Sequence, residues 1–385
     1  MANFIKKIKY NLTENSLQSL IWLIDLMPSF FGYSYLKSKV GVSFLIFVVV
    51  SSIYIVFMGS VVYQIRFKNG YLDTVKSYMN ILIFTVICNS CRWVWSQGKG
   101  LRKVLELLKK NDDMPMQFER STEKRKNIFK YLKYIVLICY TLHFINEIVI
   151  YTPKRLAKTD DFSVVSCLGL EPITKSPNKE ICTIFLVAQI FPAVIVTVCY
   201  DATFLFLFGY TAAMFGILKE ELMALDVRNE DAELQEVTGT VGDRLKNIVI
   251  RHILTLHTVE NIQDIYNFSI GFSFGADAIT MCLFFIVPLN VSLNFIPLLA
   301  HNFLTFFLYC YQGQKITTAA ERFEMAVYCC GWENFDVKEQ KIILTMLRQS
   351  QRPVIINAAT FVPICIYTFA CTMQGIYKFG AAFKS

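Results

Sequence analysis

Four histidines and a Cys-x-x-C pair are the residues of this sequence best suited to metal or acid–base chemistry. The histidines are not spaced as H-x-x-x-H, and Cys88 and Cys91 lie within an apolar stretch, where a thiol usually behaves as a small hydrophobe. The sequence also has no glycine-rich phosphate loop. We therefore expect no catalytic residue, no metal site and no cofactor. The histidines are His143, His252, His257 and His301.

The chemistry that remains is recognition by polar and aromatic side chains inside apolar segments. Tyr140, His143, Phe144 and Glu147 recur at helical spacing, and a polar group within a membrane span usually faces protein or water. This stripe is either a hydrogen-bonded seam between helices or a pocket wall, and an aromatic cleft suits a small apolar ligand. The expected pocket residues are Tyr78, Met79, Ile83, Tyr140, His143, Phe144, Glu147, Phe185, Gln189 and Pro192.

Three further sets of polar residues lie in apolar segments. A C-terminal stripe of small and polar residues predicts a face at which two helices pack closely. A second stripe indicates hydrogen bonding between helices, while Asp277 must be neutralised, paired or solvated by a partner that the sequence does not identify. The first stripe is Asn357, Thr360, Ile364, Thr368, Thr372 and Gly375, and the second is Asn294, Leu298, His301, Asn302 and Thr305.

The segments that carry these residues are those of an all-α membrane protein. Of 385 residues, 54% are apolar and 33 are Phe, more than one soluble core would use. A span needs about 20 apolar residues, because backbone groups in lipid must bond within a helix. Seven stretches qualify: 40–63, 72–95, 128–151, 181–208, 265–287, 291–311 and 354–377.

Lys and Arg residues predict the orientation of these spans. Most of them lie in the N-terminal segment and in the loops that follow the second, fourth and sixth spans. Positive charge is retained on the cytosolic side, so we expect a cytosolic N-terminus and an extracellular C-terminus. Asn11-Leu12-Thr13 is then a glycosylation acceptor that stays unmodified. Cys167 and Cys182 both flank a predicted outer loop and are the cysteines best placed to pair.

Four segments between the spans have helical periodicity. The runs at 101–110, 214–225, 245–262 and 338–349 repeat apolar residues at intervals of three and four. We expect these helices to pack together beneath the membrane as an assembly region. The alternative is that they lie flat on the inner leaflet.

The last 65 or so residues contain a more specific pattern. Tyr328 and Trp332 are followed by the run Arg348-x-Ser-Gln-Arg-Pro, then by Phe361-Val-Pro and by Thr368-Phe. This pattern resembles the C-terminal signature of insect odorant receptors. The sequence departs from the family's S-Y-S-Y ending, since it has Ile-Tyr-Lys-Phe at 376–379.

The resemblance implies a seven-helix subunit of a tetrameric, non-selective cation channel that binds a small volatile ligand. Its partners would be odorant co-receptor subunits and membrane lipid, with no nucleic acid, and its place the plasma membrane of a sensory neuron dendrite. The short loop at 218–264 fits an odour-binding tuning subunit rather than the co-receptor. Alternatives are a gustatory-type receptor channel, or a G-protein-coupled receptor or transporter, whose motifs and repeats we do not find.

The resemblance also implies a division of the chain. Residues 1–385 would form one unit, in which 40–311 hold six spans and an outer-half pocket, 312–353 an assembly segment and 354–385 a pore-lining span. In this scheme Thr368, Thr372, Gly375, Phe379 and Phe383 line the pore, where large apolar side chains can gate by excluding water. Tyr328, Trp332, Gln351 and Pro353 serve assembly.

Overall fold

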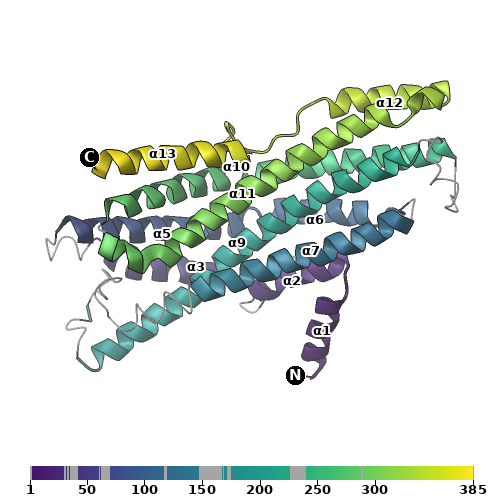
Figure 1. Cartoon of the computed structure of the whole chain (residues 1–385). Helices are drawn as coiled ribbons and strands as arrows, with labels where there is room; N and C mark the ends of the chain where they lie inside the picture. The colour runs from purple at the N-terminus through teal and green to yellow at the C-terminus, as the bar shows by residue number, and fades with distance from the viewer. Residues whose placement is uncertain are drawn as a thin grey trace.

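The computed structural model describes residues 2–29, 32, 34, 42–59, 61, 70–116, 119–146, 167, 169–170, 175–225, 240–287 and 289–384. Long helices run side by side through the length of the molecule (Figure 1). They are α1 (Ala2–Thr13), α2 (Leu17–Ser29), α3 (Val42–Ser52), η1 (Ile53–Met58), α5 (Tyr71–Ser96), α6 (Gly98–Asp112), α7 (Glu119–Phe144), α9 (Asn178–Met223), α10 (Val241–Ile286), α11 (Leu289–Cys329), η4 (Trp332–Asn334), α12 (Val337–Ser350) and α13 (Ile366–Lys384).

A helix occupies all or part of each of the seven predicted spans, in agreement with an all-α fold. They are α3 with its π-helical continuation η1, α5, α7, α9, α10, α11 and α13. Within the described residues, α9 and α10 pass a test of length and apolar composition for crossing a membrane. Each has 46 residues, or roughly 70 Å at 1.5 Å per residue, so both extend well beyond one bilayer.

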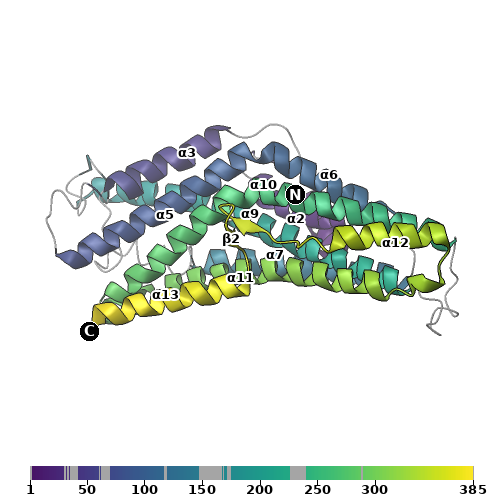
Figure 2. The same ribbon diagram turned by 90° about the horizontal axis from the view of Figure 1, so that it is seen from above.

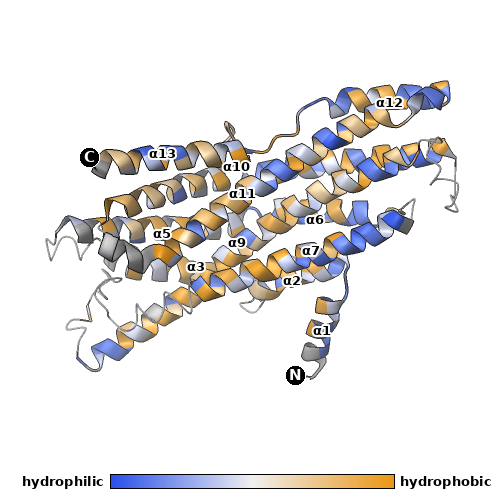
Figure 3. Ribbon diagram, viewed as in Figure 1, coloured by the Kyte–Doolittle hydropathy of each residue, from blue (hydrophilic) through white to orange (hydrophobic). Residues whose placement is uncertain are grey.

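The two ends of the bundle differ in character. The end where α6, α12 and the C-terminal part of α9 lie, here called the α12 end, carries many hydrophilic residues (Figure 3). The opposite end, where α9 begins and α13 terminates, is called the α13 end (Figure 2). The helical runs predicted between the spans are found at the α12 end, as α6, α12 and parts of α9 and α10.

Helix α9 forms the centre of the bundle and packs against α5, α7, α10 and α11. Large side chains such as Phe204, Phe208 and Tyr210 are completely buried along it. Helix α2, which was not among the predicted elements, also packs on α9 and α7. Its Leu20 and Leu23 are buried, so this short segment belongs to the core.

The α12 end contains a fully buried ion pair. The Arg251 guanidinium on α10 donates to the Glu221 carboxylate on α9 at 2.7 Å, and both side chains are inaccessible to solvent. Arg251 Nε also donates to Asn111 Oδ1 on α6 at 3.2 Å, and Asn111 Nδ2 donates to Thr255 Oγ1 at 3.1 Å. Buried charges are tolerated only when paired and hydrogen-bonded, and this network joins three helices.

The prediction for the seventh span is wrong in its first half. Residues 354–365 form no helix but contain a short antiparallel hairpin of β1 (Asn357–Ala358) and β2 (Val362–Pro363), and α13 begins only at Ile366. Asn357, Thr360 and Ile364 therefore do not share a helical face with Thr368 and Thr372. Pro363 cannot donate to a helical hydrogen bond, and Thr360 adopts a left-handed φ of 68°.

Contacts with α10 and α11 hold this hairpin in place. The Ala359 N–H donates to the Asn267 carbonyl at 2.8 Å, and the Thr360 N–H donates to Asn267 Oδ1 at 2.6 Å. The approach to α11 is equally close, since a Cβ added at Gly313 would lie 2.1 Å from the Ile364 carbonyl oxygen. Glycine is required there because any larger residue would displace the backbone before α13.

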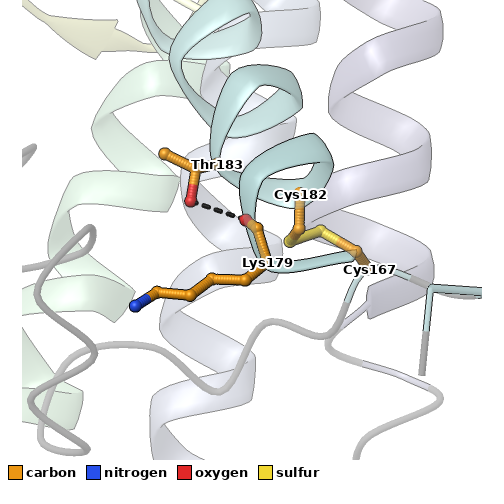
Figure 4. The surroundings of a disulfide bond; sticks show 4 residues. All are labelled: Cys167, Lys179, Cys182 and Thr183. Atoms are coloured by element: carbon orange, nitrogen blue, oxygen red, sulfur yellow. Dashed lines mark hydrogen bonds between the residues drawn. A yellow bond between two sulfur atoms is a disulfide. The ribbon is translucent and has the colours of Figure 1, made fainter. Parts of the chain in front are cut away.

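Cys167 and Cys182, the cysteines that the sequence indicated as best placed to pair, are joined in the structure. The two cysteines form a disulfide with a Cα–Cα distance of 5.9 Å, as Figure 4 shows. Cys182 lies in the second turn of α9, next to Thr183, whose hydroxyl donates to the Lys179 carbonyl at 2.8 Å. The bond ties the chain before α9 to the α13 end of the bundle.

Candidate functional site

A cavity of about 140 Å³ lies inside the bundle between α5, α7, α9, α10 and α11. We call it cavity 1. Aliphatic side chains form much of its wall, with hydroxyl and amide groups placed between them. The aliphatic wall contains Leu82, Ile83, Val86, Ile87, Ile190, Val194 and Leu298, and the uncharged polar groups are Asn80, Ser90, Gln189, Thr197, Ser273, Thr280, Asn302 and Thr305.

A cluster of titratable side chains stands on one side of cavity 1. The Asp201 carboxylate on α9 contacts His143 Nε2 on α7 at 2.8 Å and accepts a hydrogen bond from the Tyr309 hydroxyl on α11. The His301 ring meets the His143 ring edge to face, with 4.6 Å between centroids. Three neighbouring helices are thus joined by polar contacts within the membrane region, where such contacts replace water.

A second cavity of about 170 Å³ lies on the other side of this cluster, between α7, α9 and α11. Both cavities are lined by His143, Asp201, His301, Thr305 and Tyr309. The rest of the second cavity is almost entirely apolar. The histidine–aspartate cluster therefore separates the two cavities, and a molecule in either cavity would contact the same polar side chains.

Three residues that line cavity 1, Asn80, Gln189 and Tyr200, each have a buried polar atom with no partner among the described residues. Gln189 is 2% exposed, and its Nε2 donates to Ser52 Oγ at 3.1 Å while its Oε1 remains unbonded. Asn80 is 6% exposed, and its Nδ2 also lacks an acceptor. Buried polar atoms without partners are costly, and an occupant of the cavity with polar groups would satisfy them.

The structure brings together three of the predicted pocket residues, Ile83, His143 and Gln189, around cavity 1. Tyr140 lies one turn before His143 but turns away, and its hydroxyl donates to the Leu23 carbonyl of α2 at 3.0 Å. For Tyr140 this is the interhelical seam that the sequence offered as one of two interpretations. Met79 packs in a separate apolar cluster with Val75 and Phe284.

The remaining predicted pocket residues lie elsewhere. Tyr78 is 52% exposed, and Phe185 is 49% exposed with its ring against Tyr54. Phe144 is half-buried and Pro192 is buried, but neither is among the residues that line the two cavities. Glu147 lies outside the described residues.

Asp201 is the residue that the sequence analysis missed. It stands within an apolar segment of α9, as Asp277 does on α10, and the same rule for intramembrane carboxylates applies to both. The stripe on α11 was expected to make interhelical bonds, yet Leu298, His301, Asn302 and Thr305 all line cavity 1. The side chain of Asn294 lies outside the described residues.

Helix α13 packs on α10 and α11 and leaves its other side open. Of the predicted pore residues, Thr368, Thr372 and Phe379 are half-buried and Gly375 is exposed, while the side chain of Phe383 is not described. The Thr372 hydroxyl donates to the Thr368 carbonyl at 2.8 Å. The exposed stripe lies beside these residues and consists of Tyr367, Cys371, Gln374 and Lys378.

The predicted assembly residues are exposed near the α12 end. Tyr328 is 63% exposed and Trp332 is 37% exposed, and Trp332 Nε1 donates to the Tyr328 carbonyl at 3.1 Å. Gln351 and Pro353 are also exposed, just after α12. Exposed aromatic residues are typical of protein interfaces.

Comparison with known proteins is consistent with this architecture. The family model described as 7tm Odorant receptor matches residues 74–377. Odorant receptor 85b of Drosophila melanogaster is 22% identical over 194 residues, which cover 46% of this chain and 50% of that one. Odorant receptor 67a of the same species is 24% identical over 150 residues, which cover 37% of this chain and 36% of its own. The matched stretches thus span about a third to a half of these relatives.

The fold is similar to that of the insect olfactory receptor OR5 from Machilis hrabei, whose structure was also solved in complex with eugenol. The TM-score is 0.70 at 14% identity, and the alignment covers 87% of each chain. Members of the matched family are receptors, in agreement with the expectation that this chain is not an enzyme. The similarity of sequence and fold, with the match of the family model across most of the chain, shows that this protein belongs to the insect odorant receptor family.

Proposed function

We propose that this chain is the odour-binding subunit of a ligand-gated, non-selective cation channel, with a small volatile ligand in cavity 1. The observation that carries the proposal is a cavity between five helices whose wall combines aliphatic side chains with polar groups, a combination that can hold and orient a small molecule. Three of these helices, α9, α10 and α11, continue unbroken beyond the cavity. A ligand that changes their packing would act on the whole subunit.

The proposal places the α12 end in the cytosol and the α13 end outside. Two observations support this orientation: the hydrophilic α12 end carries basic residues such as Lys109 and Lys110 of α6, and the disulfide lies at the other end, near the start of α9. Disulfides form on the oxidising side of the plasma membrane, and positive charge stays in the cytosol. A glycan on Asn11 in the expressed receptor would contradict this orientation.

In this function α13 lines a pore that four subunits share, most of them odorant co-receptor chains in the membrane of a sensory neuron dendrite. The exposed side of α13 supports the proposal, because a helix that packs with only one face on its own subunit has the other available for a central pore. Tyr328, Trp332, Gln351 and Pro353 would contact neighbouring subunits at the α12 end. The pore residues would be Thr368, Thr372, Gly375, Phe379 and Phe383.

The test is co-expression with an odorant co-receptor, followed by recording of membrane current over a panel of volatiles. We expect a cation current that appears only with odour. The Ile83→Phe variant replaces an aliphatic side chain in cavity 1 with a larger aromatic one and should weaken the response. Ile253→Phe on the exposed surface of α10 is a matched control. No current to any volatile, with both chains at the cell surface, would refute the proposal.

Cysteine substitution tests which side of α13 faces ions. Thr372→Cys and Gly375→Cys represent the predicted pore face, whereas Gln374→Cys and Lys378→Cys represent the most exposed stripe, all in a Cys371→Ser background. An external thiol reagent should block current through pore-facing cysteines, and more so in odour. Block only at Gln374→Cys and Lys378→Cys would assign the pore face to the exposed stripe instead of the predicted face. Block at neither pair would exclude α13 as the pore wall.

A further inference from the structure

The carboxyl group of Asp277 lines cavity 1 from α10 without a partner among the residues that the structure describes. Among the described residues it makes no hydrogen bond and no ion pair. The other carboxylate at the cavity, Asp201, is occupied by His143 and Tyr309. Asp277 is therefore the acidic group left available to a molecule inside the cavity.

The charges around cavity 1 are unbalanced. Two aspartates line it, whereas its described lining contains no lysine and no arginine. Of the two histidines, His143 is already engaged by Asp201, and His301 packs against His143. An acidic cavity in a membrane protein favours a ligand that brings a positive charge or a hydrogen-bond donor, and it opposes an anion.

The remainder of the wall fits a ligand with a hydrocarbon part. Ile83, Val86 and Leu298 offer aliphatic surface, and contact with them is favourable for any apolar chain. The unbonded Nδ2 of Asn80 and Oε1 of Gln189 add one donor and one acceptor that are buried and unpaired. The cavity thus combines an acidic anchor, aliphatic surface and neutral polar atoms that are unpaired in the described structure.

We propose that cavity 1 selects a small amine, whose ammonium group binds Asp277 and whose hydrocarbon part lies against the aliphatic wall. The inference rests on the proposed function and names the chemical class of its ligand. A charge-assisted hydrogen bond is roughly twice as strong as a neutral one. A neutral alcohol should therefore bind Asp277 more weakly than the amine of the same length, and a carboxylic acid should be excluded.

The experiment uses a series of equal chain length: a primary alkylamine, the alcohol, a methyl ether and the carboxylic acid, applied to the receptor with its co-receptor. We expect the amine to act at the lowest concentration, then the alcohol, with a weak ether and an inactive acid. Asp277→Asn keeps the size of the side chain and removes its charge. It should raise the half-maximal concentration of the amine roughly 10- to 100-fold and that of the alcohol less.

Asp264→Asn is the matched control, because Asp264 is exposed on the same helix and does not line cavity 1; it should leave the amine response unchanged. Equal shifts for amine and ether in Asp277→Asn would overturn the inference. If Asp277→Asn fails to reach the cell surface, the order of ligand potency in the wild-type receptor decides. A methyl ether as potent as the amine would then refute the inference. Currents to other volatiles but not to amines would overturn the amine inference and leave the proposed function intact. The absence of current to any volatile would overturn the proposed function as well.

Discussion

Arg251 and Asp277 lie on the same helix, yet their surroundings are opposite. At the α12 end, Arg251 is fully buried and bonded to Glu221 and Asn111, whereas Asp277 faces cavity 1 with no partner in the described structure. The α12 end closes Arg251 and Glu221 into a network, whereas the carboxyl group of Asp277 stays open to the cavity. A closed network fixes the relative positions of the helices that it joins, while a polar group without a protein partner can bind a ligand.

Packing differs in the same way along α9. Ala193 lines cavity 1, whereas Ala212 lies in the tightly packed part of the helix, between the completely buried Tyr210 and Met214. The helix is continuous through both regions. Substitutions on one helix can therefore separate a region that serves stability from a region that serves binding.

The largest expected effect is at the buried ion pair. Arg251→Met removes the guanidinium that pairs with the buried Glu221 carboxylate, which should cost about 3–5 kcal/mol. Thermal unfolding in detergent and the amount of receptor at the cell surface would measure it. The double variant Arg251→Met with Glu221→Leu should recover most of the loss, and a single variant as stable as wild type would show that the network does not hold this end together.

The same substitution at two positions of α9 compares the two regions directly. Ala212→Leu should overpack the core and cost about 1–3 kcal/mol, whereas Ala193→Leu should occupy free volume in cavity 1 with little loss of stability. Odour responses should show the reverse order, with the larger change in Ala193→Leu. Equal unfolding temperatures and equal responses for the two variants would remove the distinction.

Gly313 should be sensitive for a different reason. A methyl group there meets the Ile364 carbonyl, so Gly313→Ala should cost about 1–2 kcal/mol and shift the backbone before α13. We expect altered current at rest in addition to lower stability. Gly216→Ala is the control, because a Cβ at Gly216 meets no atom within 4 Å, and similar behaviour of the two variants would contradict the steric explanation.

The smallest effect concerns pH at the α12 end. Burial lowers the pKa of His252 from 6.5 to about 4, and its ring packs on Phe323 at 4.6 Å. The unfolded chain therefore binds a proton before the folded one does, so stability should fall as pH drops from 6.5 towards 4, by about 1 kcal/mol at pH 5.5. His252→Leu should flatten this part of the stability profile, and an unchanged profile would assign the pH dependence to other groups.

The sequence predicted the helical spans well where lipid alone determines them. The span expected at 72–95 is α5 (Tyr71–Ser96), because an apolar segment in a membrane has few alternatives to a helix. The same rule failed at 354–365, where residues are as apolar but α10 supplies other partners. Gln263 bonds both the N–H and the carbonyl of Asn357, at 2.7 and 2.8 Å, and hydropathy contains no information about such contacts.

The site was predicted only in part for a related reason. Helical spacing placed Tyr140 and His143 on one side of α7, but one lies against α2 and the other against the cavities. Periodicity identifies residues that avoid lipid without saying which neighbour each one meets. Asp201 could have been found as an intramembrane carboxylate, whereas its pairing with His143 and Tyr309 depends on how three helices pack.

Because α10 is continuous, a movement of this helix at cavity 1 can reach the hairpin before α13. Asp277 and Asn267 are ten positions apart on this helix, or roughly 15 Å at 1.5 Å per residue, and Asn267 holds the hairpin that precedes α13. A tilt of α10 by about 4° around the cavity would displace Asn267 by about 1 Å over this distance. A small tilt of α10 at the cavity would thus reach the hairpin before α13 through the two hydrogen bonds that Asn267 accepts.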